Sequence, residues 1–304
     1  MPERLEWQGH AGAALDRAGE FTVIECEPCG FRHVIPLPAA DELREIYRQE
    51  YYTAEKPLYL ERAREDLDWW RQLYAERFDA FEALLGGRTG RLLDVGSGPG
   101  FLLEYGRERG WEVLGVEPSA AAAAHARGLG VEVVEEFLTP ELAPRLGRFD
   151  AVHLSEVLEH VPDPRSILAL CRDLTRPGGL VCASVPNDYN PFQHALRTSG
   201  GYGPWWVAPP HHLNYFEFAS LERLFARAGL EPVRRDTTFP IDMFLLMGED
   251  YVGNDALGRV CHGRRMAFER HLRAAGLEEL LRTLYQGLAQ HGLGRLAVVT
   301  ARRR

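Results

Sequence analysis

Residues 92–100 read LLDVGSGPG, an apolar run that ends in an acidic residue and three glycines at alternate positions. The next five residues, FLLEY at 101–105, read as the start of a helix. A strand, a glycine turn and a helix in this order form the nucleotide-binding start of a doubly wound α/β sheet. The dinucleotide pattern G-x-G-x-x-G places its third glycine one residue later than this chain does. The stretch therefore predicts a nucleotide-binding domain that departs from the dinucleotide pattern.

The D-x-G-x-G-x-G spacing over 94–100 resembles motif I of the class I S-adenosylmethionine (SAM) methyltransferases. Their cofactor has a cationic sulfonium, an amino acid moiety and a ribose, and no pyrophosphate. The resemblance implies that the glycines let the backbone approach SAM closely, with the Asp94 carboxylate at its cationic end. It also implies a Rossmann-like α/β fold whose seven-stranded sheet is mostly parallel, with an antiparallel last strand. The cofactor residues expected in this stretch are Asp94, Gly96, Ser97, Gly98, Gly100 and Phe101.

The next two strands also end in residues suited to a nucleoside. The run 111–118 ends in Glu117 and Pro118, about 20 residues past the glycines, where a doubly wound fold hydrogen-bonds ribose hydroxyls. The third strand, 131–134, is followed by acidic and aromatic residues where the resemblance places the adenine. The residues expected at the nucleoside are Glu117, Pro118, Glu136 and Phe137.

The fourth strand, 149–154, leads into a polar turn, SEVLEHVPDP at 155–164. This turn is similar to the E-x-x-E-H-V-x-D-P turn of the ubiquinone-biosynthesis O-methyltransferases. Its position at the carboxyl end of a parallel strand faces the ligand crevice, so Ser155 and Glu156 are expected cofactor residues.

The same turn contains candidate metal ligands. On a helical turn Glu156, Glu159 and His160 would share one face. Small-RNA 2′-O-methyltransferases carry a similar E-x-x-E-H and coordinate magnesium there, with a further histidine downstream. The resemblance thus offers a site for magnesium or another divalent ion at Glu156, Glu159, His160 and His212. Many relatives with this turn are metal-independent, and in them the histidine orders the loop.

Residues 188–210 are rich in glycine, proline and aromatic residues, and predict a long irregular insertion after the fifth strand. The insertion ends in PHHLNYF at 210–216, and the family places a histidine of this H-x-N-x-F segment beside the transferred methyl. His211 or His212, with His160, is therefore a candidate general base, because imidazole titrates near neutral pH. The alternative is that these histidines cap the following helix or form local hydrogen bonds.

The C-terminal part contains a second insertion. Strands are expected at 231–238 and 294–301, and the residues between them are too many for one helix and a connection. Helices are expected at 264–274 and 277–289. Substrate specificity is expected to depend on the insertions at 188–216 and 239–290, which would cap the acceptor side.

Residues 1–40 are expected to lie outside the sheet domain. A short strand, 21–24, precedes a Cys-x2-Cys turn, and four residues could complete a structural zinc site. These candidate zinc ligands are His10, Cys26, Cys29 and His33. The alternative is a reduced cysteine pair beside a surface histidine.

A helical lid is expected over residues 41–85, with one helix from Asp41 and a second from about Leu60 to Leu85. In methyltransferases that resemble this chain, the segment before motif I folds over the cofactor. The resemblance makes three tyrosines candidate lid contacts, with helix packing as the alternative: Tyr51, Tyr52 and Tyr59.

The composition is typical of a soluble globular protein, with 45% hydrophobic and 26% charged residues among 304. The net charge of −9 and the absence of a long basic run argue against nucleic acid as the main partner. No apolar run reaches transmembrane length, and no secretory h-region follows Met1. An odd number of cysteines, five, favours a reducing compartment, so we expect a cytoplasmic protein.

The sequence predicts three parts: a zinc knuckle (1–40), a helical lid (41–85) and a SAM-binding methyltransferase domain (86–304). The predicted activity is methyl transfer to an oxygen of a small-molecule or sugar-type acceptor. Alternatives are a sugar C-methyltransferase, an RNA 2′-O-methyltransferase, a SAM-binding interaction module without chemistry, and, last, an NAD-dependent dehydrogenase. The oligomeric state stays open, with a homodimer as one option.

Overall fold

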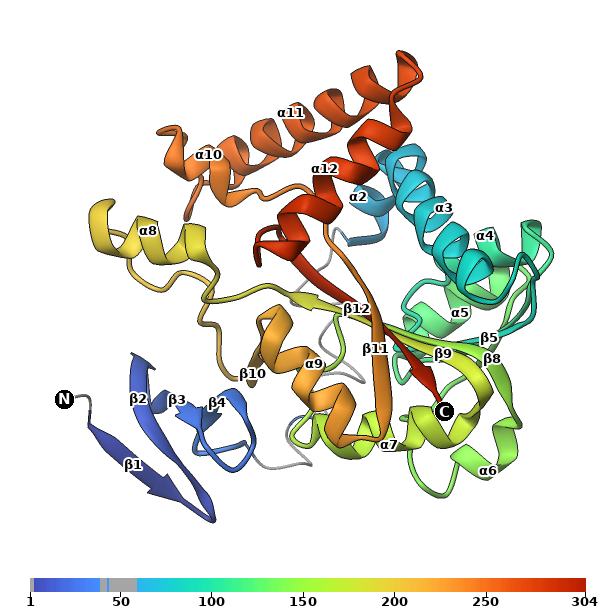
Figure 1. The fold of residues 1–304 in the computed structure, drawn as a ribbon, viewed down its shortest axis with the longest axis horizontal. Helices are drawn as coiled ribbons and strands as arrows, with labels where there is room; N and C mark the ends of the chain where they lie inside the picture. Colours follow the sequence, from blue (N-terminus) through green and yellow to red (C-terminus); the bar gives the residue numbers. More distant parts are fainter. Residues whose placement is uncertain (1–2, 39–42, 44–58) are drawn as a thin grey trace.

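The computed structural model describes residues 3–38, 43 and 59–304, and these contain a seven-stranded and a five-stranded sheet (Figure 1). The larger sheet has the order β11-β12-β9-β8-β5-β6-β7, with parallel pairs from β9 to β7 and β12 antiparallel to both neighbours. This confirms the predicted Rossmann-like sheet with an antiparallel last strand. The strands are β5 (Arg91–Val95), β6 (Glu112–Val116), β7 (Glu132–Val134), β8 (Phe149–Ser155), β9 (Thr175–Pro186), β11 (Leu230–Asp236) and β12 (Leu296–Arg303).

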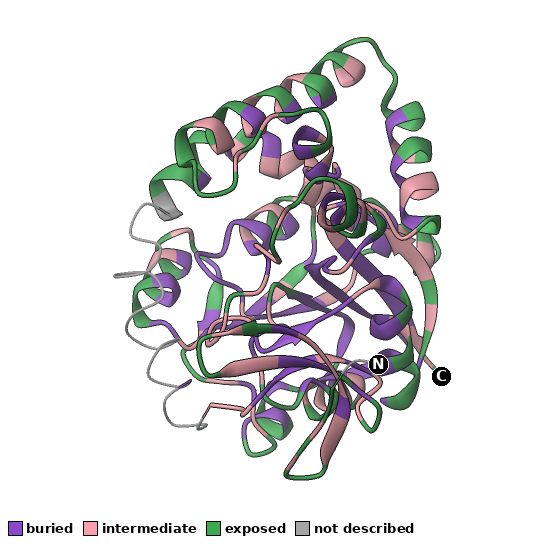
Figure 2. Cartoon of the chain, turned by 90° about the vertical axis from the view of Figure 1, so that its left-hand side faces the viewer, coloured by how far each residue is buried: buried purple, intermediate pink, exposed green. Residues whose placement is uncertain are grey.

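Helices cover both faces of this sheet, so its central strands are apolar on both sides. Leu92 packs in one core with Phe78 and Phe81, whereas the next residue, Leu93, packs in the opposite core with Phe225. Figure 2 shows the central strands as buried and the outer helix faces as exposed. One face is covered by α3 (Leu67–Leu84), α4 (Phe101–Glu108) and α5 (Ala120–Gly128). The other is covered by α6 (Ala143–Leu146), α7 (Pro164–Leu174) and α9 (Phe218–Arg227).

The N-terminal region forms an antiparallel sheet, where the sequence had predicted a single strand before the cysteine turn. Its members are β1 (Arg4–Trp7), β2 (His10–Ala18), β3 (Phe21–Cys26), β4 (Phe31–Ile35) and β10 (Asn214–Tyr215). The prediction was incomplete because β2 reads HAGAALDRA, which lacks the β-branched residues that mark a strand. The strand forms through its antiparallel pairing with β3. At Gly12 the two strands approach so closely that an added Cβ would lie 1.9 Å from the Glu25 carbonyl oxygen.

The helix expected over 60–85 is interrupted, and the structure has α2 (Tyr59–Glu65) and α3 on either side of Asp66. The Asp66 carboxylate pairs with Arg259 and accepts a hydrogen bond from His262, both on the distant helix α11 (Asp255–Ala274). A contact nearly 200 residues away along the chain therefore coincides with the break. Tyr51, Tyr52 and the helix expected from Asp41 lie outside the described residues.

The two insertions contain more helix than the sequence predicted. Residues 188–210 include α8 (Pro191–Ser199), which is capped by Asn190, whose side chain accepts hydrogen bonds from the Phe192 and Gln193 amides. The expectation of a long irregular insertion is therefore wrong for Pro191–Ser199. The second insertion contains α10 (Asp242–Leu246), α11 and α12 (Glu278–Gln290), so the first expected helix begins earlier than predicted. Among the described residues, no helix combines the length and apolarity required to cross a membrane.

Candidate functional site

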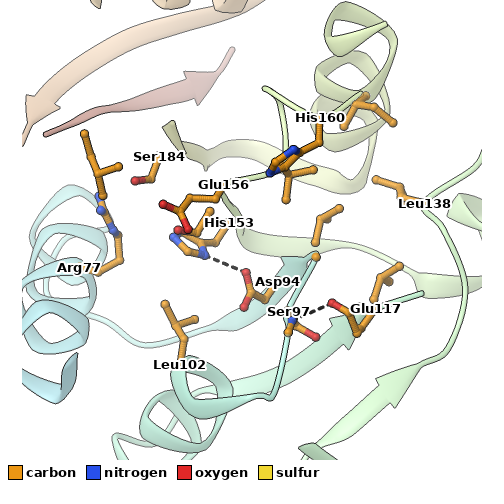
Figure 3. Close-up of a pocket in the computed structure, with 18 of the residues that line it drawn as sticks. Arg77, Asp94, Ser97, Leu102, Glu117, Leu138, His153, Glu156, His160 and Ser184 are labelled. Atoms are coloured by element: carbon orange, nitrogen blue, oxygen red, sulfur yellow. Dashed lines mark hydrogen bonds and ion pairs between the residues drawn. The ribbon is translucent and has the colours of Figure 1, made fainter. Parts of the chain in front are cut away.

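A cavity of about 1220 Å³ opens at the carboxyl ends of the parallel strands. Figure 3 shows Asp94, Glu117, His153, Glu156 and His160 around it, on two strands (β5 and β8) and in the turns after β6 and β8. The predicted cofactor residues that line it are Asp94, Gly96, Ser97, Gly98, Phe101, Glu117, Pro118, Glu136, Phe137, Ser155 and Glu156. Gly100 is the exception, because it does not line the cavity.

The glycine turn after β5 needs glycine for two different reasons. Gly96 has φ +69°, and an added Cβ would lie 2.6 Å from Val157 Cγ2, so a side chain would collide with the turn after β8. Gly100 has φ +85° and is the N-cap residue of α4; a Cβ there would lie 2.5 Å from the Cβ of Ala126 on α5. Gly96 thus shapes the cavity floor, whereas Gly100 lets two helices pack closely.

Asp94 is buried at the end of β5 and already has a protein partner. Its Oδ1 accepts a hydrogen bond of 2.8 Å from His153 Nδ1 on the neighbouring strand β8 (Figure 3). The two residues are direct partners in the parallel register. His153 was not among the predicted site residues, although it lies on the predicted fourth strand, two residues before Ser155.

Glu117 is 4% exposed and fixes the geometry of the glycine turn. Its Oε2 accepts the Gly98 amide at 2.8 Å, and its Oε1 accepts the Ser119 amide at 2.8 Å. Burial raises the pKa of the Glu117 carboxyl to about 7, although both amide hydrogen bonds oppose this shift. A buried carboxylate with two oriented oxygens can accept further hydrogen bonds from vicinal hydroxyls.

The turn after β8 does not form the helical face that the sequence predicted. Glu156 has φ +54°, and its amide donates to the Ser184 carbonyl at 2.8 Å, so residues 156–160 do not form a regular helix. The donor atoms of Glu159, His160 and His212 nevertheless lie within 4.8 Å of one another. Glu156 does not belong to this group and lines the cavity instead.

The three candidate catalytic histidines occupy different positions. His160 lines the cavity, whereas His211 and His212 do not. The Nδ1–H of His160 donates to the His211 carbonyl at 2.7 Å, and its ring meets the His212 ring edge-on at 5.0 Å between centroids. The His160 Nε2 lies 3.8 Å from Glu159 Oε1. The tandem histidines therefore contact the His160 ring and hold its orientation, and they do not face the cavity themselves.

Several cavity residues were not identified from the sequence. Arg77 on α3 and Arg234 on β11 bring cationic side chains to the cavity, and Tyr285 comes from α12. The insertion at 239–290 thus contributes to the cavity as expected, whereas no residue of 188–216 lines it. That first insertion packs instead on the N-terminal sheet, where Trp206 and Tyr215 share a core with Val34.

The predicted zinc ligands come together in the N-terminal sheet. The donor atoms of His10, Cys26, Cys29 and His33 lie within 4.8 Å of one another.

Comparison with known proteins places the fold and the motifs in one family. A family profile described as "Methyltransferase domain" matches residues 68–235. The ubiquinone biosynthesis O-methyltransferase of Cereibacter sphaeroides is 35% identical over 181 residues, which cover 56% of this chain and 72% of that protein. The enzyme of the same description from Acinetobacter baumannii is 37% identical over 167 residues, which cover 49% of this chain and 70% of that protein.

Solved structures resemble the fold at low identity. Magnesium protoporphyrin IX methyltransferase from Synechocystis PCC 6803, with bound S-adenosylhomocysteine (SAH), has a TM-score of 0.52 and 13% identity, covering 88% of this chain and 100% of that one. The 1,6-didemethyltoxoflavin-N1-methyltransferase from Burkholderia thailandensis has a TM-score of 0.50 and 19% identity, covering 99% of this chain and 98% of that one.

Proposed function

The chain belongs to the class I SAM-dependent methyltransferases, and we propose that it methylates an oxygen atom of a small-molecule or sugar-type acceptor. The observation that carries this proposal is that one cavity contains both the motif I residues and His160. Its volume of about 1220 Å³ exceeds the roughly 300–1,000 Å³ of a typical small-molecule site, so two reactants fit. The assignment to oxygen is supported by the curated relatives, which are described as O-methyltransferases.

The cavity residues fit SAM at its polar ends. Asp94 and Glu117 bring two buried carboxylates to the cavity, and a side chain at Gly96 would fill the space between the turns. We assign Asp94 to the amino acid end and Glu117 to the ribose hydroxyls, with Phe137 against the adenine. SAM supplies an electrophilic methyl group on a cationic sulfur.

His160 is the candidate base in this proposal. Because its Nδ1–H donates to the His211 carbonyl, Nε2 is the nitrogen that can accept the acceptor's proton. Glu159, whose Oε1 lies 3.8 Å away, would stabilise the resulting imidazolium. A general base of this kind contributes about 10²–10⁴-fold to a rate. Positioning of the acceptor in the cavity supplies the remainder.

A second candidate mechanism uses a divalent ion in place of the base. The observation that favours it is the grouping of Glu159, His160 and His212, a carboxylate and two imidazoles whose donor atoms lie within 4.8 Å. These three residues would hold the ion, which would lower the pKa of an acceptor hydroxyl.

The experiment is a survey of acceptors with the purified 304-residue chain. We expect SAH release with one class of phenolic, sugar or other hydroxyl compound, and a methyl–oxygen linkage in the product by NMR. A methyl–carbon linkage would overturn the O-methylation proposal. Omitting and then restoring Mg²⁺ or Mn²⁺ in the same assay separates the mechanisms, because only the metal-assisted one requires an ion at Glu159, His160 and His212.

A further inference from the structure

Four metal-binding side chains meet at one end of the N-terminal sheet. His10 begins β2, Cys26 ends β3, Cys29 lies in the turn between β3 and β4, and His33 lies within β4. His10 Nδ1 is 3.1 Å from His33 Nε2, 3.3 Å from Cys29 Sγ and 3.8 Å from Cys26 Sγ. One ring nitrogen therefore faces the other three donor atoms.

These separations match the edges of a tetrahedral zinc site. With Zn–N bonds of about 2.0 Å and Zn–S bonds of about 2.3 Å, neighbouring ligand atoms lie about 3.3–3.8 Å apart. Two imidazoles and two thiolates form a closed four-ligand set, which is typical of structural rather than catalytic zinc. Cys26 and His33 are each only 2% exposed, so the sheet itself fixes half of the set.

The surroundings orient the ligands. The His33 Nδ1–H donates to the Val34 carbonyl at 2.8 Å, which directs the lone pair of Nε2 toward the other three donors. The cysteine turn is closed by the Gly30 amide, which donates to the Cys26 carbonyl at 2.8 Å. Gly30 has φ +79°, as a tight turn of this kind requires.

Helix α9 of the methyltransferase domain holds the cysteine turn from outside. Arg227 donates to the carbonyls of Pro28 and Cys29, and Arg223 donates to the Gly30 carbonyl at 3.0 Å. The turn is thus anchored to the larger sheet through three backbone carbonyls.

Strand β4 connects this cluster to the histidine loop, defined here as residues 211–214. Figure 1 shows β10 beside β4, next to α9, and His33 is paired directly with Asn214. The Val34 amide donates to the Leu213 carbonyl at 2.9 Å, and the Leu213 amide donates to the Glu159 carbonyl at 2.7 Å. Two backbone hydrogen bonds thus connect β4, the strand that contains His33, to the turn that contains His160.

We propose that the N-terminal sheet binds one structural zinc ion through His10, Cys26, Cys29 and His33, and that this ion fixes the histidine loop behind His160. On binding, the two thiols become thiolates and release their protons to solvent, and both imidazoles bind as neutral rings. The ion closes β2, β3 and β4 against one another, so β4 presents a rigid edge to β10.

The first test is the metal content of the full chain, purified without chelators and dialysed against metal-free buffer. We expect about one zinc per chain by elemental analysis. Cys29→Ser and His10→Gln should each lose the ion. Cys261→Ala, at a buried cysteine of α11, and His194→Gln, at an exposed histidine of α8, should keep it. A parent chain without metal that takes up no zinc in competition with a chromophoric chelator overturns the proposal, as does a Cys26–Cys29 disulfide in that chain.

Cobalt substitution tests the ligand set in the parent chain and does not depend on a variant that folds. Replacing zinc with Co²⁺ should give the intense visible bands of a tetrahedral ion together with a thiolate-to-cobalt charge-transfer band. A weak octahedral spectrum without that band would contradict the proposed Cys2His2 set.

Hydrogen exchange tests the connection to the histidine loop. Removing zinc should increase exchange on the order of tenfold or more at the amides of Val34 and Leu213. The amides of Gly98 and Glu117, in the turns after β5 and β6, should be unaffected and serve as the internal control. Unchanged exchange at Leu213 in zinc-free chain would exclude the coupling. None of these three measurements depends on the acceptor, so failure of the proposed function would not affect their results.

Discussion

The two ends of the cavity are built in different ways. At the cofactor end, Asp94, Gly98 and Glu117 come from two adjacent strands and the turns that follow them, and Glu117 bonds directly to the Gly98 amide. At the histidine end, His160 depends on the carbonyl of His211, 51 residues later, and this loop in turn pairs with β4 of the second sheet.

This difference teaches where each end is vulnerable. The cofactor end is specified within a short stretch of chain, since strands, glycines and carboxylates occur in one strand–turn–helix–strand sequence. The histidine end requires two sheets to meet in the correct register. We expect substitutions at the two ends to separate cofactor affinity from turnover.

The largest effect should come from His160→Gln. Loss of the candidate base should lower turnover by about 10²–10⁴-fold and leave SAM affinity nearly unchanged, because His160 is assigned to the acceptor. Initial-rate measurement of SAH release and calorimetric titration with SAM check both parts. His194→Gln, an exposed histidine on α8, is the matched control. If H160Q lost SAM affinity by as large a factor as it lost turnover, His160 would belong to the cofactor end of the cavity.

Glu117→Ala should have the opposite profile. Removing a carboxylate that accepts hydroxyl hydrogen bonds costs about 1.5–3 kcal/mol, so the Kd for SAM should rise about 10–100-fold. Glu112→Ala, at the start of the strand that Glu117 follows and with an exposed side chain, should leave the Kd unchanged. If both variants bound SAM as tightly as the parent, the ribose assignment of Glu117 would be wrong.

The pH dependence of SAM binding should also reveal Glu117. Its pKa is raised to about 7, and ribose hydroxyls donate to the ionised form, so affinity should be full above about pH 7 and fall below it. The fall should approach about tenfold per pH unit, and Glu117→Gln should remove it.

The pH dependence of folding stability should have the opposite sign. The raised pKa of Glu117 stabilises the folded SAM-free chain below about pH 4.5, and this contribution is lost as pH rises through about 7. Calorimetry and thermal unfolding between pH 5 and 8 test both directions.

The smallest effect on SAM binding should come from Gly100→Ala. This substitution separates glycines that line the cavity from a glycine that lets two helices pack closely. Gly100 has a left-handed backbone conformation, and the added Cβ would lie 2.5 Å from the Cβ of Ala126. The free energy of unfolding should therefore fall by about 1–3 kcal/mol. SAM affinity of the folded chain should stay close to that of the parent, because Gly100 does not line the cavity. Gly128→Ala, where an added Cβ meets no atom within 4 Å, is the control in thermal unfolding.

The sequence predicted the larger sheet well because its signals are local. Apolar runs such as 92–95 and 149–154 predicted strands, and the glycine turn after Asp94 marked the cavity. The sequence predicted the structure less well where contacts between residues distant in the chain determine it. The helix break at Asp66 occurs where that carboxylate pairs with Arg259, and no local pattern reports such a contact.

The motif at 94–100, together with Glu117 downstream, predicted the fold class, the methyl donor and the two carboxylates at the cavity through the resemblance that these residues carry. Periodicity and turn chemistry are short-range properties, so a single chain segment carries them. Only the tertiary structure decided that His153 occupies one oxygen of Asp94, that His160 rather than His211 or His212 faces the cavity, and that the N-terminal sheet supports this histidine. These outcomes depend on register between strands far apart in sequence, and register is set by the packing of whole sheets.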